Sequence, residues 1–209
     1  MQNSFPYLDI LIFGVIAIFL IFRLKSILGT KTDFEETNIN KKNQDKQFTN
    51  LVSLEAKKSD LENQELNKIL AVDPKFNITD FLTGSKNFFE MVLNSFVSGN
   101  LDKIKDFTKP SVLKSFKAAI EERNKENETL IIDLKSIKEN KIVKSTVTKS
   151  SIKLNVKYVS LQIRALMDKH EQIIDGDDKK EIIVKDEWVF ERKIDDQNPN
   201  WTLIETKSY

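Results

Sequence analysis

The spacing of apolar residues changes once along this chain, near Asn127, and this change constrains the fold more than any other feature. Before Asn127, apolar residues recur at steps of three and four, which gives a helix one apolar face. After it, apolar and polar residues alternate, the period of a strand with one buried face. Helices followed by antiparallel strands predict an α+β domain, with three helices packed on a bent antiparallel sheet.

The clearest helical stretch runs from Phe81 to Val97. Asn77 or Thr79 can cap its start, and Gly99 can end it, because glycine accepts the left-handed conformation that closes many helices. A short helix is expected next, capped by Asn100, with Leu101, Ile104 and Phe107 facing inward. Pro110 is expected to open a third helix, since the first turn needs no backbone N–H from it.

The second half of the chain predicts a series of short strands. In the longest of them, apolar residues occupy the even-numbered positions up to Tyr158 and the odd-numbered positions from Val159 on. This change of parity indicates a β-bulge or a strong bend in that strand. Asp175-Gly176 is expected to supply a hairpin turn, and Asn198-Pro199-Asn200 the turn before the last strand. The expected strands are Leu130–Leu134, Ile142–Val147, Ile152–Met167, Ile182–Phe190 and a last one with Trp201 and Leu203.

The N-terminal part of the chain predicts a membrane anchor over residues 1–29. Ile10 to Phe22 holds no charged residue and covers about 20 Å as a helix; counting from Phe5 lengthens it to about 27 Å, close to the ~30 Å hydrocarbon core. Asp9 would then lie near an interface, where a charge costs little. The expected anchor residues include Ile10, Phe13, Ile16, Phe19 and Phe22.

Two other interpretations of this segment are weaker. A cleaved secretory signal would need a basic N-terminal region and a cleavage site between small residues, and neither is present. A buried core helix would need a packing partner nearby, but a long polar stretch follows. Arg23, Lys25 and Lys31 lie on the C-terminal side only, so the positive-inside rule predicts a single-pass protein with its C-terminal domain in the cytoplasm.

Residues 30–72 read as a polar linker between the anchor and one domain over residues 73–209. Residues 51–70 carry a weak helical stripe of leucines and one isoleucine among charges. This stripe predicts an amphipathic helix that docks on a membrane, on a partner or on the chain's own domain; a partly helical spacer is the alternative.

Composition excludes several classes of function. The chain has 33 basic and 32 acidic residues, so it has no basic field to attract nucleic acid. It has no cysteine, hence no disulfide, thiol nucleophile or thiolate metal site. Its one histidine, His170, lies in a polar stretch and is expected to be an exposed loop residue. We therefore expect no catalytic residues, no metal and no cofactor.

Three stretches of the chain resemble the bacterial TimA proteins, members of the Tim44-like family and relatives of the scaffold of the mitochondrial import motor. They are Leu20 to Thr32, Phe81 to Phe96 and Asp186 to Thr206. The last contains the spaced motifs Trp188-x-Phe190-Glu191-Arg192 and Asn198-Pro199-Asn200-Trp201. The resemblance covers the anchor and the region from about Phe76 to the end.

This resemblance implies a cone-like fold similar to that of nuclear transport factor two, with an apolar cavity against the bent sheet. Its lining would include Phe89, Val92, Trp188 and Phe190. It also implies a non-enzymatic adaptor at the bacterial inner membrane, whose partners are membrane lipid and an unidentified protein related to translocation or to a chaperone.

The alternative is a cone-fold small-molecule binder, or an enzyme of the isomerase or dehydratase type, because one fold hosts many functions. Such an enzyme needs an acid–base pair in its cavity. Asp186 and Tyr158 are the pair that this sequence offers, and their burial side by side would favour this alternative.

Overall fold

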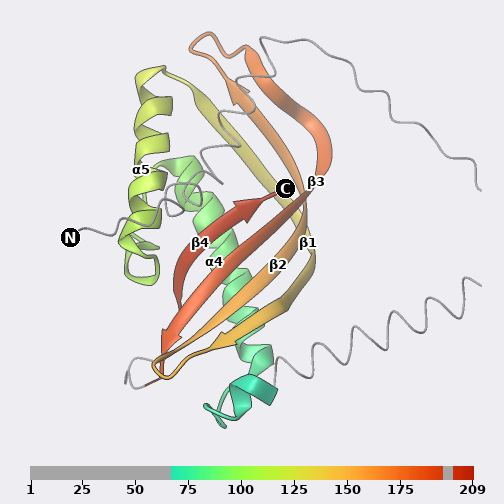
Figure 1. Cartoon of the computed structure of the whole chain (residues 1–209). Helices are drawn as coiled ribbons and strands as arrows, with labels where there is room; N and C mark the ends of the chain where they lie inside the picture. The colour runs from blue at the N-terminus through green and yellow to red at the C-terminus, as the bar shows by residue number, and fades with distance from the viewer. Residues whose placement is uncertain (1–66, 195–199) are drawn as a thin grey trace, which may run out of the picture.

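The computed structural model describes residues 67–194 and 200–209 (Figure 1). Helices come first and a four-stranded antiparallel sheet follows, so the predicted α+β class is confirmed. Within these ranges, no helix combines the length and apolar character needed to cross a membrane. The predicted anchor, residues 30–66 of the predicted linker and the turn residues Asn198 and Pro199 lie outside the described residues.

Helix α4 spans Ile78–Ser98, close to the predicted range. The side-chain oxygen of Asn77 accepts hydrogen bonds from the backbone N–H groups of Thr79 and Asp80, at 2.9 and 3.2 Å. At the other end Gly99 adopts a φ of 75°, the left-handed conformation that a side chain would disfavour. Both predicted ends of the helix are therefore confirmed.

Of the remaining helices, α5 (Pro110–Lys125) begins at Pro110 as predicted. The short helix expected after Asn100 begins only at Lys105, as the 3₁₀ helix η1 (Lys105–Phe107). Arg123 of α5 is buried and donates hydrogen bonds to the backbone carbonyl oxygens of Phe96 and Val97, at 3.0 and 3.1 Å. These bonds connect α5 to the C-terminal end of α4 and satisfy carbonyls that the helix itself leaves free.

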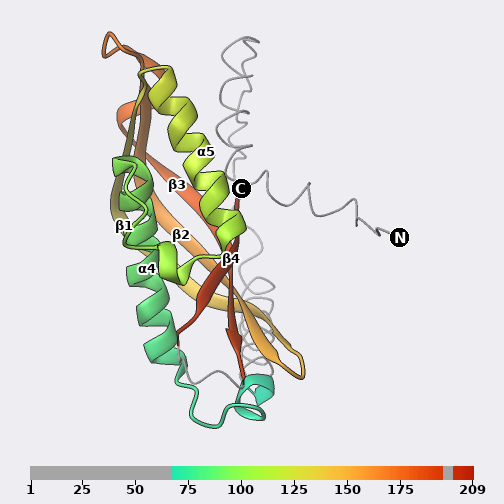
Figure 2. The same ribbon diagram turned by 90° about the vertical axis from the view of Figure 1, so that its left-hand side faces the viewer.

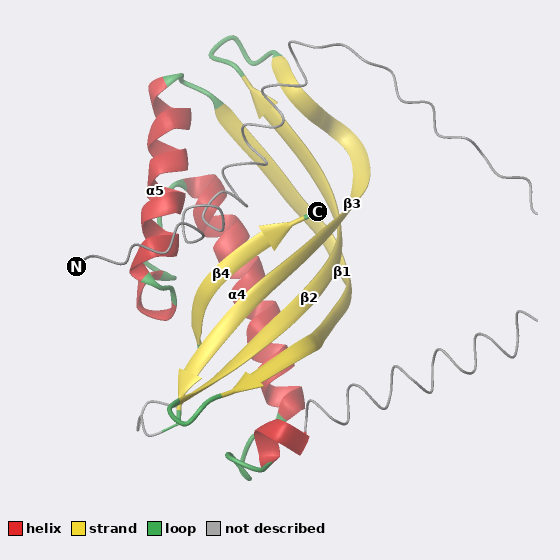
Figure 3. Cartoon of the chain, viewed as in Figure 1, coloured by secondary structure: helices red, strands yellow, loops and turns green. Residues whose placement is uncertain are grey.

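The sheet is a meander in the order β1-β2-β3-β4 (Figure 3). Its strands are β1 (Thr129–Val147), β2 (Ser151–Met167), β3 (Ile173–Lys193) and β4 (Thr202–Ser208). The two short strands predicted before residue 150 are parts of the single long strand β1. Both helices lie on the concave face of the curved sheet (Figure 2).

The residues skipped in the pairing of β2 with its two neighbours lie in β1 and β3 and not in β2, where the change of parity indicated a β-bulge or a strong bend. Each residue of β2 from Ile152 to Met167 has a partner on β1, whereas Lys135, Lys138 and Val143 are skipped in the register of β1. Each skipped residue reverses the direction of the next side chain and bends the strand. The change of parity in β2 therefore has another cause: beyond Tyr158, the polar residues of β2 lie on the concave face and the apolar residues on the convex face.

The Asp175-Gly176 pair does not form the hairpin turn that was predicted. Gly176 lies inside β3 with a φ of 75°, and a Cβ atom there would lie 2.2 Å from the backbone oxygen of Arg164. The glycine serves a β-bulge and a close backbone approach. The turn is made by Asp168, whose carboxylate accepts hydrogen bonds from the backbone N–H groups of His170 and Gln172.

The core lies between α4 and the concave face of the sheet. Ile69, near the start of the described chain, is fully buried in this core. Asp73 forms an ion pair with Arg192 at the end of β3, and the Arg192 guanidinium lies 5.0 Å from the centre of the Trp201 ring. The segment that leads into α4 is thus held against the C-terminal part of the sheet.

Candidate functional site

The four residues predicted to line an apolar cavity come together in the core. Phe89 and Val92 lie one turn apart on α4, and Trp188 and Phe190 lie on β3. All four are buried, and the ring centres of Phe89 and Trp188 are 4.7 Å apart. The structure therefore places these side chains side by side, and their role as a cavity lining stays a prediction.

The two faces of β2 exchange their character near Tyr158. Tyr158 faces α4, because its ring stacks on Phe89 at 4.4 Å, and alternate residues of a strand share one face. Up to Tyr158 this concave face is apolar; beyond it the same face carries polar residues, and the apolar residues are on the convex face. The concave residues are Ile152, Leu154, Val156, Tyr158, Ser160, Gln162 and Arg164.

One row of polar residues crosses all four strands where this exchange occurs. Asn140 of β1 lies opposite Tyr158 of β2, Tyr158 lies opposite Asp186 of β3, and Asp186 lies opposite Ser208 of β4. Residues directly opposite in an antiparallel pair point to the same face. The four side chains therefore lie together on the concave side. Asp186 and Tyr158 form the pair that the sequence singled out.

Asp186 is the most unusual member of this row. It is 7 % exposed, and the Ser208 hydroxyl donates a hydrogen bond to its Oδ1 atom. Its Oδ2 atom is buried and has no hydrogen-bond partner among the residues that the structure describes. Burial raises the pKa of this carboxyl group, and the Ser208 hydrogen bond and the charge of Arg164 oppose that rise.

Tyr158 is fully buried beside it. Its hydroxyl group donates a hydrogen bond to the backbone oxygen of Ser85 on α4, at 3.2 Å. Burial raises the pKa of this hydroxyl, and the negative charge of Asp186 raises it further. Tyr158 therefore stays protonated at neutral pH and can still accept one hydrogen bond.

A second polar chain continues along the concave face of β2. The Arg164 Nε atom donates to Gln162 at 2.8 Å, and the Gln162 amide donates to the Ser160 hydroxyl at 2.6 Å. Ser160 and Gln162 are fully buried. Burial lowers the pKa of Arg164, and Asp186 opposes this effect, so the two opposite charges act on each other across this part of the sheet.

Sequence reasoning missed Asn140, Ser208 and the chain from Ser160 to Arg164. One signal in the sequence could have indicated the chain from Ser160 to Arg164. Residues 160, 162 and 164 continue the even-numbered series of buried residues that ends at Tyr158. Polar residues that continue a buried parity indicate a polar interior. Asn140 and Ser208 could not be found in this way, because bulges and pairing register decide which way they point.

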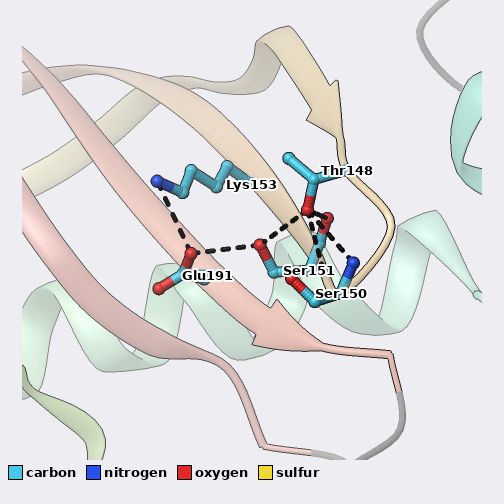
Figure 4. Close-up of polar contacts among 5 residues, drawn as sticks. All are labelled: Thr148, Ser150, Ser151, Lys153 and Glu191. Carbon is cyan, nitrogen blue, oxygen red and sulfur yellow. Dashed lines mark hydrogen bonds and ion pairs between the residues drawn. The ribbon is translucent and has the colours of Figure 1, made fainter.

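The other polar cluster has a structural explanation. Figure 4 shows Thr148, Ser151, Lys153 and Glu191 at the β1–β2 hairpin. The Thr148 hydroxyl accepts the backbone N–H of Ser151 at 2.9 Å, and the Ser151 hydroxyl donates to Glu191 at 3.2 Å. Lys153 lies 3.5 Å from the same carboxylate oxygen. These contacts close the hairpin and attach it to β3.

The expected character of His170 is confirmed: it is exposed in the turn between β2 and β3. Over residues 67–194 and 200–209, no group of three or more His, Cys, Asp or Glu side chains is placed to hold a metal ion.

Comparison with known proteins confirms the resemblance. A search among curated proteins found no match. The family model for the Tim44-like domain matches residues 62–208, which is more than half of the chain and includes α4, α5 and all four strands. This chain therefore belongs to the family of proteins that carry a Tim44-like domain.

Proposed function

We propose that this protein is a membrane-anchored adaptor whose C-terminal domain binds a protein partner or lipid at the inner membrane, in a role connected with protein translocation. The observation that carries the proposal is the Tim44-like domain over residues 62–208. The charge-free segment Ile10–Phe22 and the basic residues after it support the anchor and the cytoplasmic side.

The domain arrangement suits an adaptor. Ile69 and the Asp73–Arg192 ion pair hold the entering chain against the domain. A partner bound to the domain would then stay within reach of the membrane, at a distance set by the linker. Tethering of this kind raises the effective concentration of a partner near a membrane site.

Affinity capture with cross-linking from native membranes tests this function. The bait is the full-length chain, and the matched control bait is the anchor and linker alone, residues 1–72. We expect proteins of a protein-conducting channel or a DnaK-type chaperone to cross-link to the full-length bait only. Identical capture by both baits would contradict a partner-binding role for the domain.

One observation favours a second function, the binding or conversion of a small molecule. Asp186 and Tyr158 are buried side by side on the concave face, and one oxygen of Asp186 has no partner among the described residues. A buried titratable pair of this kind is more typical of a ligand site than of an adaptor surface. An Asp186→Asn variant that folds and captures partners normally, but fails to support the protein's cellular role, would favour this second function.

A further inference from the structure

The concave face buries two oxygen atoms that lack a donor in the described part of the chain. They are Oδ2 of Asp186 and Oδ1 of Asn140, in the same row on either side of Tyr158. A buried acceptor without a hydrogen bond costs free energy, and more so when it carries a charge. Folded proteins satisfy nearly all such atoms with protein groups, ordered water or a ligand.

The charges around this row restrict what can approach Asp186. A cation would be attracted by Asp186 but repelled by Arg164, whose guanidinium interacts electrostatically with the Asp186 carboxylate. An anion would be attracted by Arg164 and repelled by Asp186. An uncharged group avoids both penalties, and desolvating it costs far less than desolvating an ion.

The hydrogen-bonding capacity of the row restricts the ligand further. Asp186 and Asn140 offer acceptors, whereas the Tyr158 hydroxyl already donates to Ser85 and has an acceptor lone pair free. The Arg164 guanidinium uses its Nε–H for Gln162 and has further N–H groups. A ligand group that donates one hydrogen bond and accepts another matches this set.

We propose that the Asp186–Tyr158 row is a binding site for an uncharged hydrogen-bond donor, a hydroxyl or carboxamide group that donates to Oδ2 of Asp186. This inference specifies the chemistry of the ligand in the second proposed function. If the ligand is an organic molecule, the inference rests on that function. The same donor chemistry can come from a permanently bound water molecule, which would need two to four polar partners.

Three probes of the same shape separate the charge classes: acetamide is neutral, acetate is an anion and acetamidinium is a cation. Each is titrated into the full-length, isotope-labelled chain in detergent micelles, and amide resonances are followed by NMR. We expect acetamide to shift the resonances of residues 158–160 and 184–188. The two ions should bind there at least about ten-fold more weakly, because each meets a like charge.

Two variants and one control locate the effect. Asp186→Leu removes the acceptor and should abolish the acetamide response, and Asp186→Asn should weaken it by about ten-fold, since a bond to a charged acceptor is the stronger one. The control is Glu187→Gln, because Glu187 is the next residue of β3, points to the opposite face and bonds to Asn155 at 2.7 Å. This variant should respond like the wild type.

The bound-water source gives a different result. If bound water supplies the donor, long-lived water contacts to the Trp188 and Tyr158 ring protons should be present in the wild type and absent in Asp186→Leu, and acetamide should cause no response. This result would support the donor chemistry and contradict the small-molecule function. Preferred binding of either ion would overturn the inference. The inference would also be overturned by a protein group that donates a hydrogen bond to Oδ2 of Asp186, or by a ¹³C chemical shift of the Asp186 carboxyl carbon typical of a protonated acid at pH 7.

Discussion

Tyr158 and Asp186 lie directly opposite each other on β2 and β3, and both point toward α4. Toward one end of the sheet their neighbours on this face are Val156 and Trp188, which pack in the core. Toward the other end the face continues on β2 with Ser160 and Gln162. The pair therefore lies at the border between an apolar and a polar interior, where a carboxylate can be buried with only part of its hydrogen bonds satisfied.

The pH dependence of stability follows from this position. Burial raises the pKa of Asp186 above its ordinary value near 3.8, so the folded domain holds this proton more tightly than the unfolded chain does. The contribution of Asp186 to stability is then fully present below pH 3.8 and is lost as pH rises through the folded-state pKa. Ionisation of this buried carboxyl therefore destabilises the fold relative to its protonated form.

Asp186→Asn should therefore raise the melting temperature at pH 7, by about 2–6 °C for a domain of this size. The gain should shrink as pH falls, because a growing fraction of the wild-type carboxyl is then protonated. Circular dichroism melts between pH 4 and 8 measure both effects, with the exposed Asp178→Asn as control. A variant that melts below the wild type at pH 7 would contradict this account of Asp186.

Phe190 on β3 should contribute far more to stability than Phe107 at the end of η1. Phe190 is 3 % exposed and packs edge-on against Phe81, whereas Phe107 is 36 % exposed. Phe190→Ala should cost about 3–5 kcal/mol of unfolding free energy, because it leaves a cavity in the core. Phe107→Ala should cost clearly less. Urea unfolding of both variants measures the difference, and equal losses would show that the burial of Phe190 is not decisive.

Local signals allowed much of the fold to be predicted from the sequence. Asn77, Gly99 and Pro110 act on the few residues around them, through a side-chain cap, a left-handed backbone and a fixed φ. Their effect does not depend on the rest of the molecule, so the helix ends could be read directly.

The bulges and the polar row depend instead on how strands pair. Nothing near Lys135 or Val143 distinguishes a bulged residue from a regular one; the register against β2 decides it. In the sequence, Asp175-Gly176 predicts a turn, because turns and bulges both use a positive φ and local residues do not separate the two. Asp186 and Tyr158 could be suggested as a pair by their chemistry, but Ser208 and Asn140 join them only through register.

Two glycine substitutions should have opposite effects. A Cβ atom at Gly176 would lie 2.2 Å from the backbone oxygen of Arg164, so Gly176→Ala should destabilise the domain by about 1–3 kcal/mol. A Cβ atom at Gly84 in α4 would meet nothing within 4 Å, so Gly84→Ala should stabilise it by about 0.5–1 kcal/mol. Urea unfolding measures both. If Gly176→Ala left the unfolding free energy unchanged, the bulge in β3 would contribute little to stability.

The proposed membrane anchor makes a prediction that is independent of the domain. If Ile10–Phe22 lies in hydrocarbon, the full-length chain should stay in the membrane pellet after washes with high salt and with alkaline carbonate, because salt does not weaken apolar burial. A variant that lacks residues 5–22 should appear in the soluble fraction with its domain folded. Full-length protein in the alkaline supernatant would contradict the anchor.

The orientation of that anchor is tested separately. Arg23, Lys25 and Lys31 follow the apolar segment and no Lys or Arg precedes it, so the positive-inside rule predicts a cytoplasmic domain. Protease added to intact spheroplasts should leave the domain uncut, and the same protease should cut in the polar linker once the membrane is permeabilised. Moving the charges, with Arg23→Gln, Lys25→Gln and two lysines added before Phe5, should weaken or invert this protection. Cleavage of the wild type from outside would show that the domain lies on the other side of the membrane.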